Sequence, residues 1–257
     1  GAVTLGRLRR NYGIKNFDYG PAAGSGSYRY GMTDWLTLEG HAEGAQELAL
    51  GGAGTVIKLG QFGVVNTSYS QSRMRGDAGG QINWGYQYST SEFSVATQHT
   101  RRDRGFGNLA LYDQPTVYDE NDKPIASFSR NTDQYSLTFN LGRYGNIGAA
   151  WIGVESFDSQ KTELLNLSWS RNLWGASSIY LAGSRDRQRG DWTVALSLQV
   201  PLGARDSAAV TVENTPDAGS TQRINYNHSM PSDGGFSWNM AWANQSRSSD
   251  YQQGTLG

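Results

Sequence analysis

The stretch Trp192-Thr193-Val194-Ala195-Leu196-Ser197-Leu198-Gln199-Val200 decides the fold, because large apolar residues alternate along it with small or polar ones. Successive side chains of a β-strand point to opposite faces, so this alternation predicts a strand with one apolar and one polar face. The same period of two recurs along much of the chain. It is clearest in residues 82–89, 134–141, 164–170 and 236–243.

Short turns separate these stretches. Gly, Asn and Asp, which tolerate the positive φ of tight hairpins, recur in them. The spacing predicts about 16 strands, each near the ~9–11 residues that cross a bilayer when tilted. They should follow one another as antiparallel hairpins, and no helical period exceeds one turn. The turns lie at residues 142–146, 158–160, 203–206, 216–219 and 232–235.

The predicted fold is all-β: a transmembrane antiparallel up-and-down β-barrel, or a large segment of one. A mean hydropathy of −0.58 does not oppose a membrane barrel, because only every second residue of its wall faces lipid. A soluble β-sandwich would show the same alternation. Two features favour the barrel. The polar face is rich in Ser, Thr, Asn and Gln, as a water-filled lumen would be. Aromatic residues are expected at strand ends and turns, namely Trp35, Tyr144, Trp151 and Trp174.

The sequence contains no motif of a catalytic, cofactor or metal site, and the chain is not expected to be an enzyme. The absence of cysteine excludes disulfides, thiolate catalysis and Cys-ligated zinc. No histidine among His41, His99 and His228 has a neighbour at ligand spacing, so each is expected to be solvated or hydrogen-bonded. Glu39 and Glu43 lie four residues apart on one strand face and are expected to be lumen or rim charges.

Three further stretches are expected to be structural. Residues 51–54 are glycine-rich but lack the Lys and Ser/Thr of a phosphate loop, so they predict a bend or thin spot in the wall. Residues 101–104 and 185–189 read as charged turns in solvent, with contact to lipid head groups or to substrate as the alternative. Asp119 to Asp122 lacks the ligand spacing of a calcium loop. The net charge of −1 gives no indication of a nucleic-acid partner.

One segment has a more specific character. It reads Gly26-Ser27-Tyr28-Arg29-Tyr30-Gly31-Met32-Thr33-Asp34-Trp35-Leu36-Thr37-Leu38-Glu39-Gly40-His41-Ala42-Glu43, and it follows Leu8-Arg9-Arg10-Asn11-Tyr12-Gly13. The chain resembles the fimbrial outer-membrane usher family of the chaperone–usher pathway, in the part of the translocation barrel that follows the plug insertion. Later stretches such as Asn166–Ser170 and Ala195–Gly203 resemble usher strands less specifically.

The resemblance implies a location in the outer membrane of a Gram-negative bacterium as a multi-pass β-barrel. It implies that residues 1–257 form one translocation-pore region, with the signal peptide, the N-terminal chaperone-binding domain, the plug and the C-terminal domains absent. The implied function is to conduct pilus subunits across the membrane during fimbrial assembly. The implied partners of the parent usher are fimbrial subunits, periplasmic chaperone–subunit complexes and lipid. The resemblance also allows a homodimer, and no cofactor is expected.

Strand parity then nominates side chains that face the pore, because each alternates with apolar neighbours. Two rival functions stay open. A diffusion porin would fold a constriction loop into its lumen, and residues 113–131 are the candidate, although a connection this long also suits an external loop. A soluble β-rich carbohydrate-binding domain would need an aromatic platform or convergent carboxylates. The nominated pore-facing residues are Arg29, Glu39, Gln134, Asn140, Asn166, Arg223 and Asn225.

Overall fold

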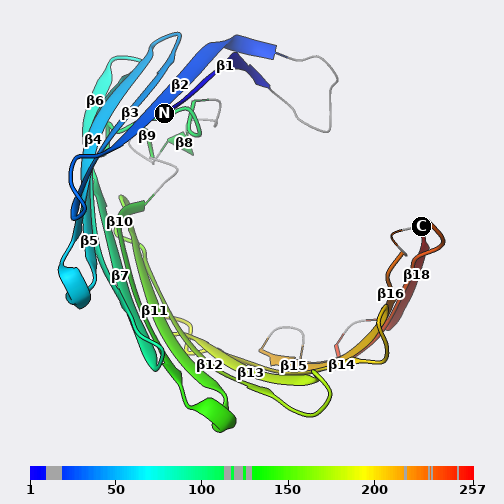
Figure 1. The fold of residues 1–257 in the computed structure, drawn as a ribbon. Helices are drawn as coiled ribbons and strands as arrows, with labels where there is room; N and C mark the ends of the chain where they lie inside the picture. The colour runs from blue at the N-terminus through cyan, green and yellow to red at the C-terminus, as the bar shows by residue number, and fades with distance from the viewer. Residues whose placement is uncertain are drawn as a thin grey trace. The chain divides into compact units, whose positions relative to one another are not determined.

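A computed structural model describes residues 1–9, 19–112, 117–118, 124–125, 129–216, 219–230, 232, 234–247 and 249–257. Across these residues sixteen strands are hydrogen-bonded in the order in which they follow one another along the chain (Figure 1). The paired strands are antiparallel in both halves of the chain. The up-and-down meander predicted from the alternation is therefore confirmed.

The first half of the sheet is formed by strands β1 to β7 and a short turn helix. Its elements are β1 (Ala2–Arg9), β2 (Tyr19–Gly31), β3 (Leu36–Ala45), β4 (Leu48–Lys58), η1 (Gly60–Phe62), β5 (Val64–Met74), β6 (Asp77–Ser89) and β7 (Phe93–Arg102). A separate two-stranded ladder joins β8 (Val117–Tyr118) to β9 (Pro124–Ile125).

The second half continues the same order with nine further strands. Its elements are β10 (Ser129–Asn140), η2 (Gly142–Tyr144), β11 (Asn146–Ser156), β12 (Lys161–Asn172), β13 (Ser178–Asp186), β14 (Trp192–Pro201), β15 (Asp206–Thr215), β16 (Gly219–His228), β17 (Trp238–Gln245) and β18 (Tyr251–Leu256). No helix among the described residues is long and apolar enough to cross a membrane.

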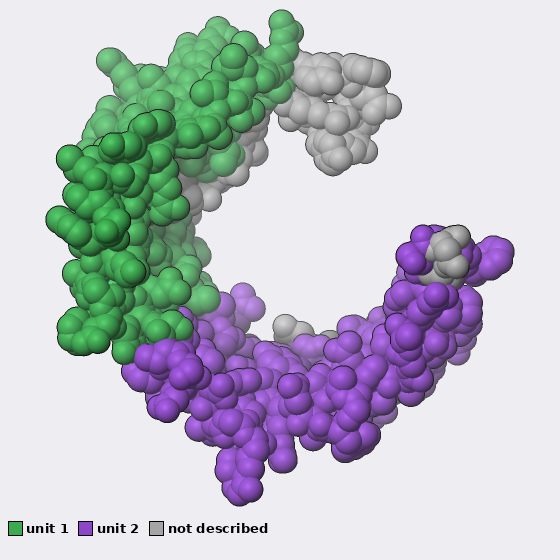
Figure 2. Space-filling model, viewed as in Figure 1, with its two compact units in different colours: residues 1–89, 95–135, 152–162 green, residues 90–94, 136–151, 163–257 purple. Residues whose placement is uncertain are grey.

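The chain divides into two compact units, drawn in different colours in Figure 2. Unit 1 contains residues 1–89, 95–135 and 152–162, and unit 2 contains residues 90–94, 136–151 and 163–257. The division passes through β7, β10, β11 and β12 rather than through a linker. It is therefore a division of the sheet.

The turns are short and use the backbone freedom of glycine where it is needed. The β10–β11 turn is an example. Gly142 and Gly145 adopt φ values of 58° and 93°, and the Gly145 N–H donates to the Gly142 carbonyl at 3.0 Å. Side chains with a Cβ are strained at such angles, so glycine ends one strand and starts the next within five residues. Turns were predicted here from the same glycines.

Four sequence expectations need correction or restriction. Trp151 lies in the middle of β11 and not at a strand end. Arg101 and Arg102 belong to β7, so residues 101–104 are only partly a turn. In the expected connection at 113–131, β10 already begins at Ser129, because its first five residues are all polar and carry no alternation that would mark them as a strand. Most of residues 113–128, Asp119 to Asp122 included, and residues 10–18 of the usher-like segment lie outside the described residues.

Candidate pore-facing surface

Cross-strand register defines the two faces of the sheet in unit 1. Arg29 pairs with Glu39, which pairs with Gly54 and then Ser68 on the next strands. One row further along, Ser27, His41, Gly52 and Ser70 are opposite one another in the same way. Paired residues share a face, so these eight residues form one continuous surface across β2 to β5. We call it the polar face.

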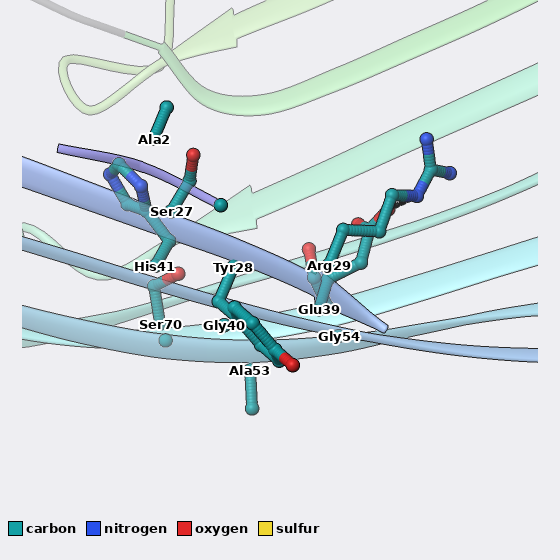
Figure 3. A pocket seen from close by; sticks show the side chains of 13 residues that line it. Ala2, Ser27, Tyr28, Arg29, Glu39, Gly40, His41, Ala53, Gly54 and Ser70 are labelled. Carbon is teal, nitrogen blue, oxygen red and sulfur yellow. Dashed lines mark ion pairs between the residues drawn. The ribbon is translucent and has the colours of Figure 1, made fainter. Parts of the chain in front are cut away.

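A hollow of about 570 Å³ lies on this polar face, bordered by Arg29, Glu39 and His41 (Figure 3). The Arg29 guanidinium Nε is 2.8 Å from the Glu39 carboxylate. Glycine forms the floor because a Cβ at Gly54 would lie 2.9 Å from the Ser68 Cβ, closer than side-chain atoms approach. The register continues through residues 51–54 without a shift. The glycines at 52 and 54 therefore make the wall thin here, without a β-bulge.

Each histidine makes a hydrogen bond to a carboxylate. This is one of the two roles, solvated or hydrogen-bonded, that the sequence predicted. The contacts are His41 to Glu43 at 2.8 Å, His99 to Asp133 at 2.7 Å and His228 to Asp206 at 2.7 Å. The His228 ring also stacks on Trp238, with centroids 3.9 Å apart. Among the described residues no group of three or more His, Cys, Asp or Glu side chains is placed to hold a metal ion.

Residues 103–112, which follow β7, fold back across the polar face of unit 1. We call them the inward strap. The Gly107 N–H donates to the Ser72 hydroxyl at 2.8 Å, and the Leu109 N–H donates to the Glu43 carboxylate at 2.7 Å. At the start of the strap, the Asp103 carboxylate accepts a hydrogen bond from the Gly80 N–H at 2.8 Å. Ser72, Glu43 and Gly80 belong to three strands, so the strap spans part of the wall.

The far end of the strap is held by Tyr112. Its hydroxyl donates to the Gln46 carbonyl, and its own carbonyl accepts from the Arg75 guanidinium at 2.6 Å. Phe106 and Tyr112 are each 4% exposed. Leu48 and Leu50 are also buried, and both lie on the polar face of β4, where the alternation elsewhere places small or polar residues. These apolar residues form the small core of unit 1.

The strap approaches the wall closely because glycines on both sides of the contact have no Cβ. A Cβ at Gly79 would lie 2.6 Å from the Gly105 carbonyl carbon, and one at Gly107 would lie 2.7 Å from the Met74 Cε. Contacts this short force something to move. Sequence reasoning missed the strap. The available signal was Leu48 and Leu50, which place bulk on a face that is otherwise polar.

In unit 2 the polar face is uncharged over most of its width. Asn166 is opposite Ser184, which is opposite Thr193. Thr211 is opposite Arg223, and Ala209 is opposite Asn225. A second hollow, of about 380 Å³, is lined largely by small and hydroxyl side chains, including Ser136, Thr138, Asn166, Ser168 and Thr193.

The seven nominated residues fall into three groups. Arg29 and Glu39 form one ion pair on the polar face of unit 1, and Asn166, Arg223 and Asn225 lie on the polar face of unit 2. Gln134 and Asn140 share the parity of Ser136 and Thr138 on β10, and both are exposed. Asn140 is the last residue of β10, and its side chain makes two hydrogen bonds there. Its amide donates to the Ser91 carbonyl at 3.2 Å, and its Oδ1 accepts from the Gly142 N–H at 2.9 Å. The Arg223 Nε is buried without a hydrogen-bond partner among the described residues.

The opposite face of unit 2 carries large apolar side chains that remain exposed. Leu196, Val210 and Ile224 are 42%, 42% and 45% exposed, although the register places them together on one face. A water-soluble protein rarely leaves so continuous an apolar surface uncovered, whereas a barrel wall in lipid requires one. A polar face and an exposed apolar face on a paired antiparallel meander define the wall of a transmembrane β-barrel.

The comparison with known proteins identifies the family of this barrel wall. Residues 2–257 match the family described as outer membrane usher protein, and the chain belongs to that family. It is 25% identical over 191 residues to the outer membrane usher protein AfaC of Escherichia coli, an overlap of 68% of this chain and 22% of AfaC. The resemblance to ushers noted in the sequence is therefore confirmed.

Solved structures show the same fold. The P pilus usher PapC translocation pore matches 98% of this chain and 52% of its own, with a TM-score of 0.58 and 19% identity. PapC in the Escherichia coli P pilus tip assembly intermediate PapC-PapD-PapK-PapG matches 100% of this chain and 33% of its own, with a TM-score of 0.71 and 20% identity. The chain thus spans about half or less of each relative.

Proposed function

We propose that this chain forms part of the wall of an usher pore in the outer membrane, and that its polar face lines the path of fimbrial subunits. The observation that carries the proposal is the register of unit 2. It aligns Asn, Ser, Thr and Ala across β12 to β16 on one face and exposed Leu, Val and Ile on the other. Within a family of outer membrane ushers, the first face suits water and passing protein, and the second suits lipid.

A polar wall with few charges suits the passage of folded protein. Hydroxyl and amide side chains hydrogen-bond to water and present no apolar patch to hold a passing subunit. The nearby ions in unit 1 are paired, as in Arg29 with Glu39, which limits their attraction for either sign of charge. The residues proposed to face the pore are Arg29, Glu39, Gln134, Asn140, Asn166, Arg223 and Asn225.

The remaining expectations follow from the same proposal. Residues 1–257 act as one barrel region that crosses the membrane with each of its long strands. The partners are fimbrial subunits presented by periplasmic chaperones, a homodimer rests on the resemblance alone, and the role is transport without catalysis. Among the described residues the inward strap at 103–112 also suits a diffusion porin, because it covers part of the polar face; most of the loop expected to do this, 113–131, lies outside the described residues.

Cysteine accessibility tests the proposal, because the chain has no native cysteine to give background labelling. Asn225→Cys and Ile224→Cys are adjacent on β16 and point to opposite faces, so each is the matched control of the other. In cells that assemble pili, a water-soluble maleimide should label Asn225→Cys, and a lipid-soluble one should label Ile224→Cys. Attachment of a bulky reagent at residue 225 should reduce pilus assembly, and the same reagent at residue 224 should not.

The opposite labelling pattern would refute the assignment of the polar face. Correct labelling with unchanged pilus assembly and a reduced flux of small solutes would favour the diffusion porin. A chain that stays in the soluble fraction and shows no shift on heating in mild detergent would contradict the membrane location.

A further inference from the structure

Strands β7 and β14 each contain ten residues, but their outer faces, opposite the polar face, differ in polarity. The Thr100 hydroxyl donates to Asn83, which is opposite Ser68 of the polar face, so the odd-numbered residues of β7 lie on the outer face. The outer side chains of β14 are Trp192, Val194, Leu196, Leu198 and Val200. Those of β7 are Phe93, Val95, Thr97, His99 and Arg101. The outer face of β7 is therefore apolar over only about half of its length.

The polar half of that face joins three neighbouring strands of unit 1 at one site. The His99 Nδ1 is 2.7 Å from the Asp133 carboxylate, and the Arg101 guanidinium is 2.9 Å from the same oxygen. The His99 ring stacks on Trp84 with the ring centroids 5.0 Å apart, and the Arg101 guanidinium carbon lies 5.4 Å from the Trp84 centroid. We call His99, Arg101 and Asp133 the outer polar cluster. The usher function proposed above gives it no role.

The outer face of β3 and β4, also in unit 1, loses its apolar bulk in the same way. Beyond Leu38, which is opposite Thr55, the outer residues of both strands are small. This end of the two strands adjoins the inward strap, because the Leu109 N–H donates to Glu43 there. Glycine and alanine offer lipid little apolar area, so the shortage of apolar surface extends beyond β7. The small residues are Gly40, Ala42 and Gly44 on β3 and Ala49, Gly51 and Ala53 on β4.

These patterns set the apolar height of the wall. At a rise of ~3.3 Å per residue, β14 presents about 33 Å of apolar strand and residues 93–97 of β7 present about 17 Å. Tilted strands need about 9–11 residues to cross a bilayer. The β7 stretch is not extended at its other end, where residues 90–92 are Thr, Ser and an exposed Glu. Charged side chains are strongly unfavourable in hydrocarbon, so the apolar part of β7 is too short for a bilayer of ordinary thickness.

We propose that the outer face of unit 1 binds a locally thinned bilayer, with lipid head groups at the level of the outer polar cluster. This rests on the proposed function, which places the outer face in lipid. A bilayer meets a short apolar band by thinning, and head groups and water then reach charged side chains that hydrocarbon would leave unsolvated.

Two features of the cluster select lipid head groups over a partner protein. Asp133 is within ion-pair distance of both Arg101 and His99, so the cluster presents little net charge to a complementary protein surface. Trp84 and Tyr135 border it, and the Tyr135 ring centroid is 5.2 Å from that of His99. Tryptophan and tyrosine concentrate at the level of head groups. The apolar band of unit 1 therefore ends where these two rings lie.

Spin-label depth measurements test the proposal in the usher that contains this chain, reconstituted in dioleoyl phosphatidylcholine vesicles. Nitroxides are attached to Phe93→Cys, Val95→Cys and Thr97→Cys on β7, and to Leu198→Cys on β14 as the control in a full-height band. Collisions with a water-soluble nickel chelate become rarer with depth in the bilayer, whereas collisions with oxygen become more frequent. We expect the chelate collision rate at all three β7 positions to exceed that at residue 198 severalfold.

Bilayer thickness gives a second readout. From dimyristoyl to dioleoyl phosphatidylcholine the mismatch grows, so the folding equilibrium constant of the native usher should fall by about tenfold. Replacing the whole outer polar cluster by leucine lengthens the apolar band without leaving an unpaired charge, so the fall should shrink to about threefold or less. The control places three leucines on the polar face of the same two strands, in Gln98→Leu with Thr100→Leu and Gln134→Leu, and should retain the tenfold fall.

The spin labels leave the outer polar cluster intact and are decisive even where the leucine variants do not fold. A β7 label as deep as the one at residue 198 would overturn the proposal, because it would show a bilayer of full thickness displaced along the strand. Labels at residues 93, 95 and 97 that are shielded from both oxygen and the chelate would overturn it by showing a protein on this face. A control label at residue 198 that meets the chelate freely would instead refute the proposed function, because the outer face would then not lie in lipid.

Discussion

Strands β2 to β4 in unit 1 and strands β14 to β16 in unit 2 place their bulky side chains differently. On the apolar side of β14 to β16, Leu196 is opposite Val212 and Leu198 is opposite Val210. The corresponding side of β2 to β4 carries mainly small residues toward one end of the strands, and its bulk there lies on the polar side, in Leu48 and Leu50. The small residues are Gly24, Gly26, Gly40, Ala42, Gly44, Ala49, Gly51 and Ala53.

The inward strap explains why unit 1 has bulky side chains on its polar face. In unit 1 it covers part of the polar face, so apolar side chains such as Leu50 are buried there instead of being exposed to water. The polar face of β14 to β16 carries Ser197, Thr211 and Asn225, and no large apolar residue of the kind seen at Leu48 and Leu50. Large apolar side chains therefore lie wherever water is excluded, by lipid in one region and by the protein itself in the other.

The largest expected effect comes from charging one face of β14. Leu196→Arg places a guanidinium in the apolar band, where such a substitution costs about 2–4 kcal/mol near the bilayer midplane. Ala195→Arg, one residue away on the polar face, should cost less than about 1 kcal/mol, because water solvates the charge. Denaturant unfolding in lipid vesicles, followed by tryptophan fluorescence, measures both. Equal costs at the two positions would show that the faces are not distinguished by lipid.

A smaller effect is expected where the strap meets the wall. Gly79→Ala places a Cβ 2.6 Å from the Gly105 carbonyl carbon, so the strap must move, at a cost of about 1–3 kcal/mol. Gly183→Ala in β13 has no heavy atom within 4 Å of the new Cβ and should change the free energy of unfolding by less than about 0.5 kcal/mol. Limited proteolysis within residues 103–112 should become faster only in Gly79→Ala. A protected strap in that variant would contradict the close packing.

The smallest effect is expected from the ion pair in the unit 1 hollow. The Arg29 and Glu39 side chains are 66% and 40% exposed, and exposed pairs contribute about 0.2–1 kcal/mol. A double-mutant cycle with Arg29→Gln and Glu39→Gln should give a coupling energy in this range, decreasing as salt is added. A coupling above about 2 kcal/mol, or one insensitive to salt, would show that the pair is far less exposed to water than the hollow suggests.

Much of the fold was predictable, because its signal is local. The alternation in residues 192–200 specifies a strand, its two faces and its approximate ends, and the structure gives β14 as Trp192–Pro201. The turn at Gly142 and Gly145 was equally local, because glycine is the residue that adopts its φ values without strain. The wrong placement of Trp151 has the same origin: a tryptophan in an alternating stretch carries no local mark of its height in the membrane.

The candidate site was less predictable, because its contacts are not local. Parity placed Asn166, Arg223 and Asn225 on one polar face, but it gave no indication that Arg102 in β7 would donate to Gln81 at 2.6 Å. It also read residues 101–104 as one charged turn, because a run of charges resembles a solvated loop whether or not neighbouring strands pair with it. The usher-like stretch at residues 26–43 carried the resemblance to the family without showing what contacts its carboxylates.

The sequence by itself therefore determined the strands, their antiparallel order and the polarity of the two faces, since each follows from the two-residue period of an extended chain. Tertiary structure alone decided where water is excluded. The Leu109 N–H reaches Glu43 across 66 residues of sequence, and this contact belongs to the strap that turns part of the polar face of unit 1 into a buried core. A contact between segments so far apart leaves no periodic trace in either segment, because neither has to change its own pattern for the two to meet.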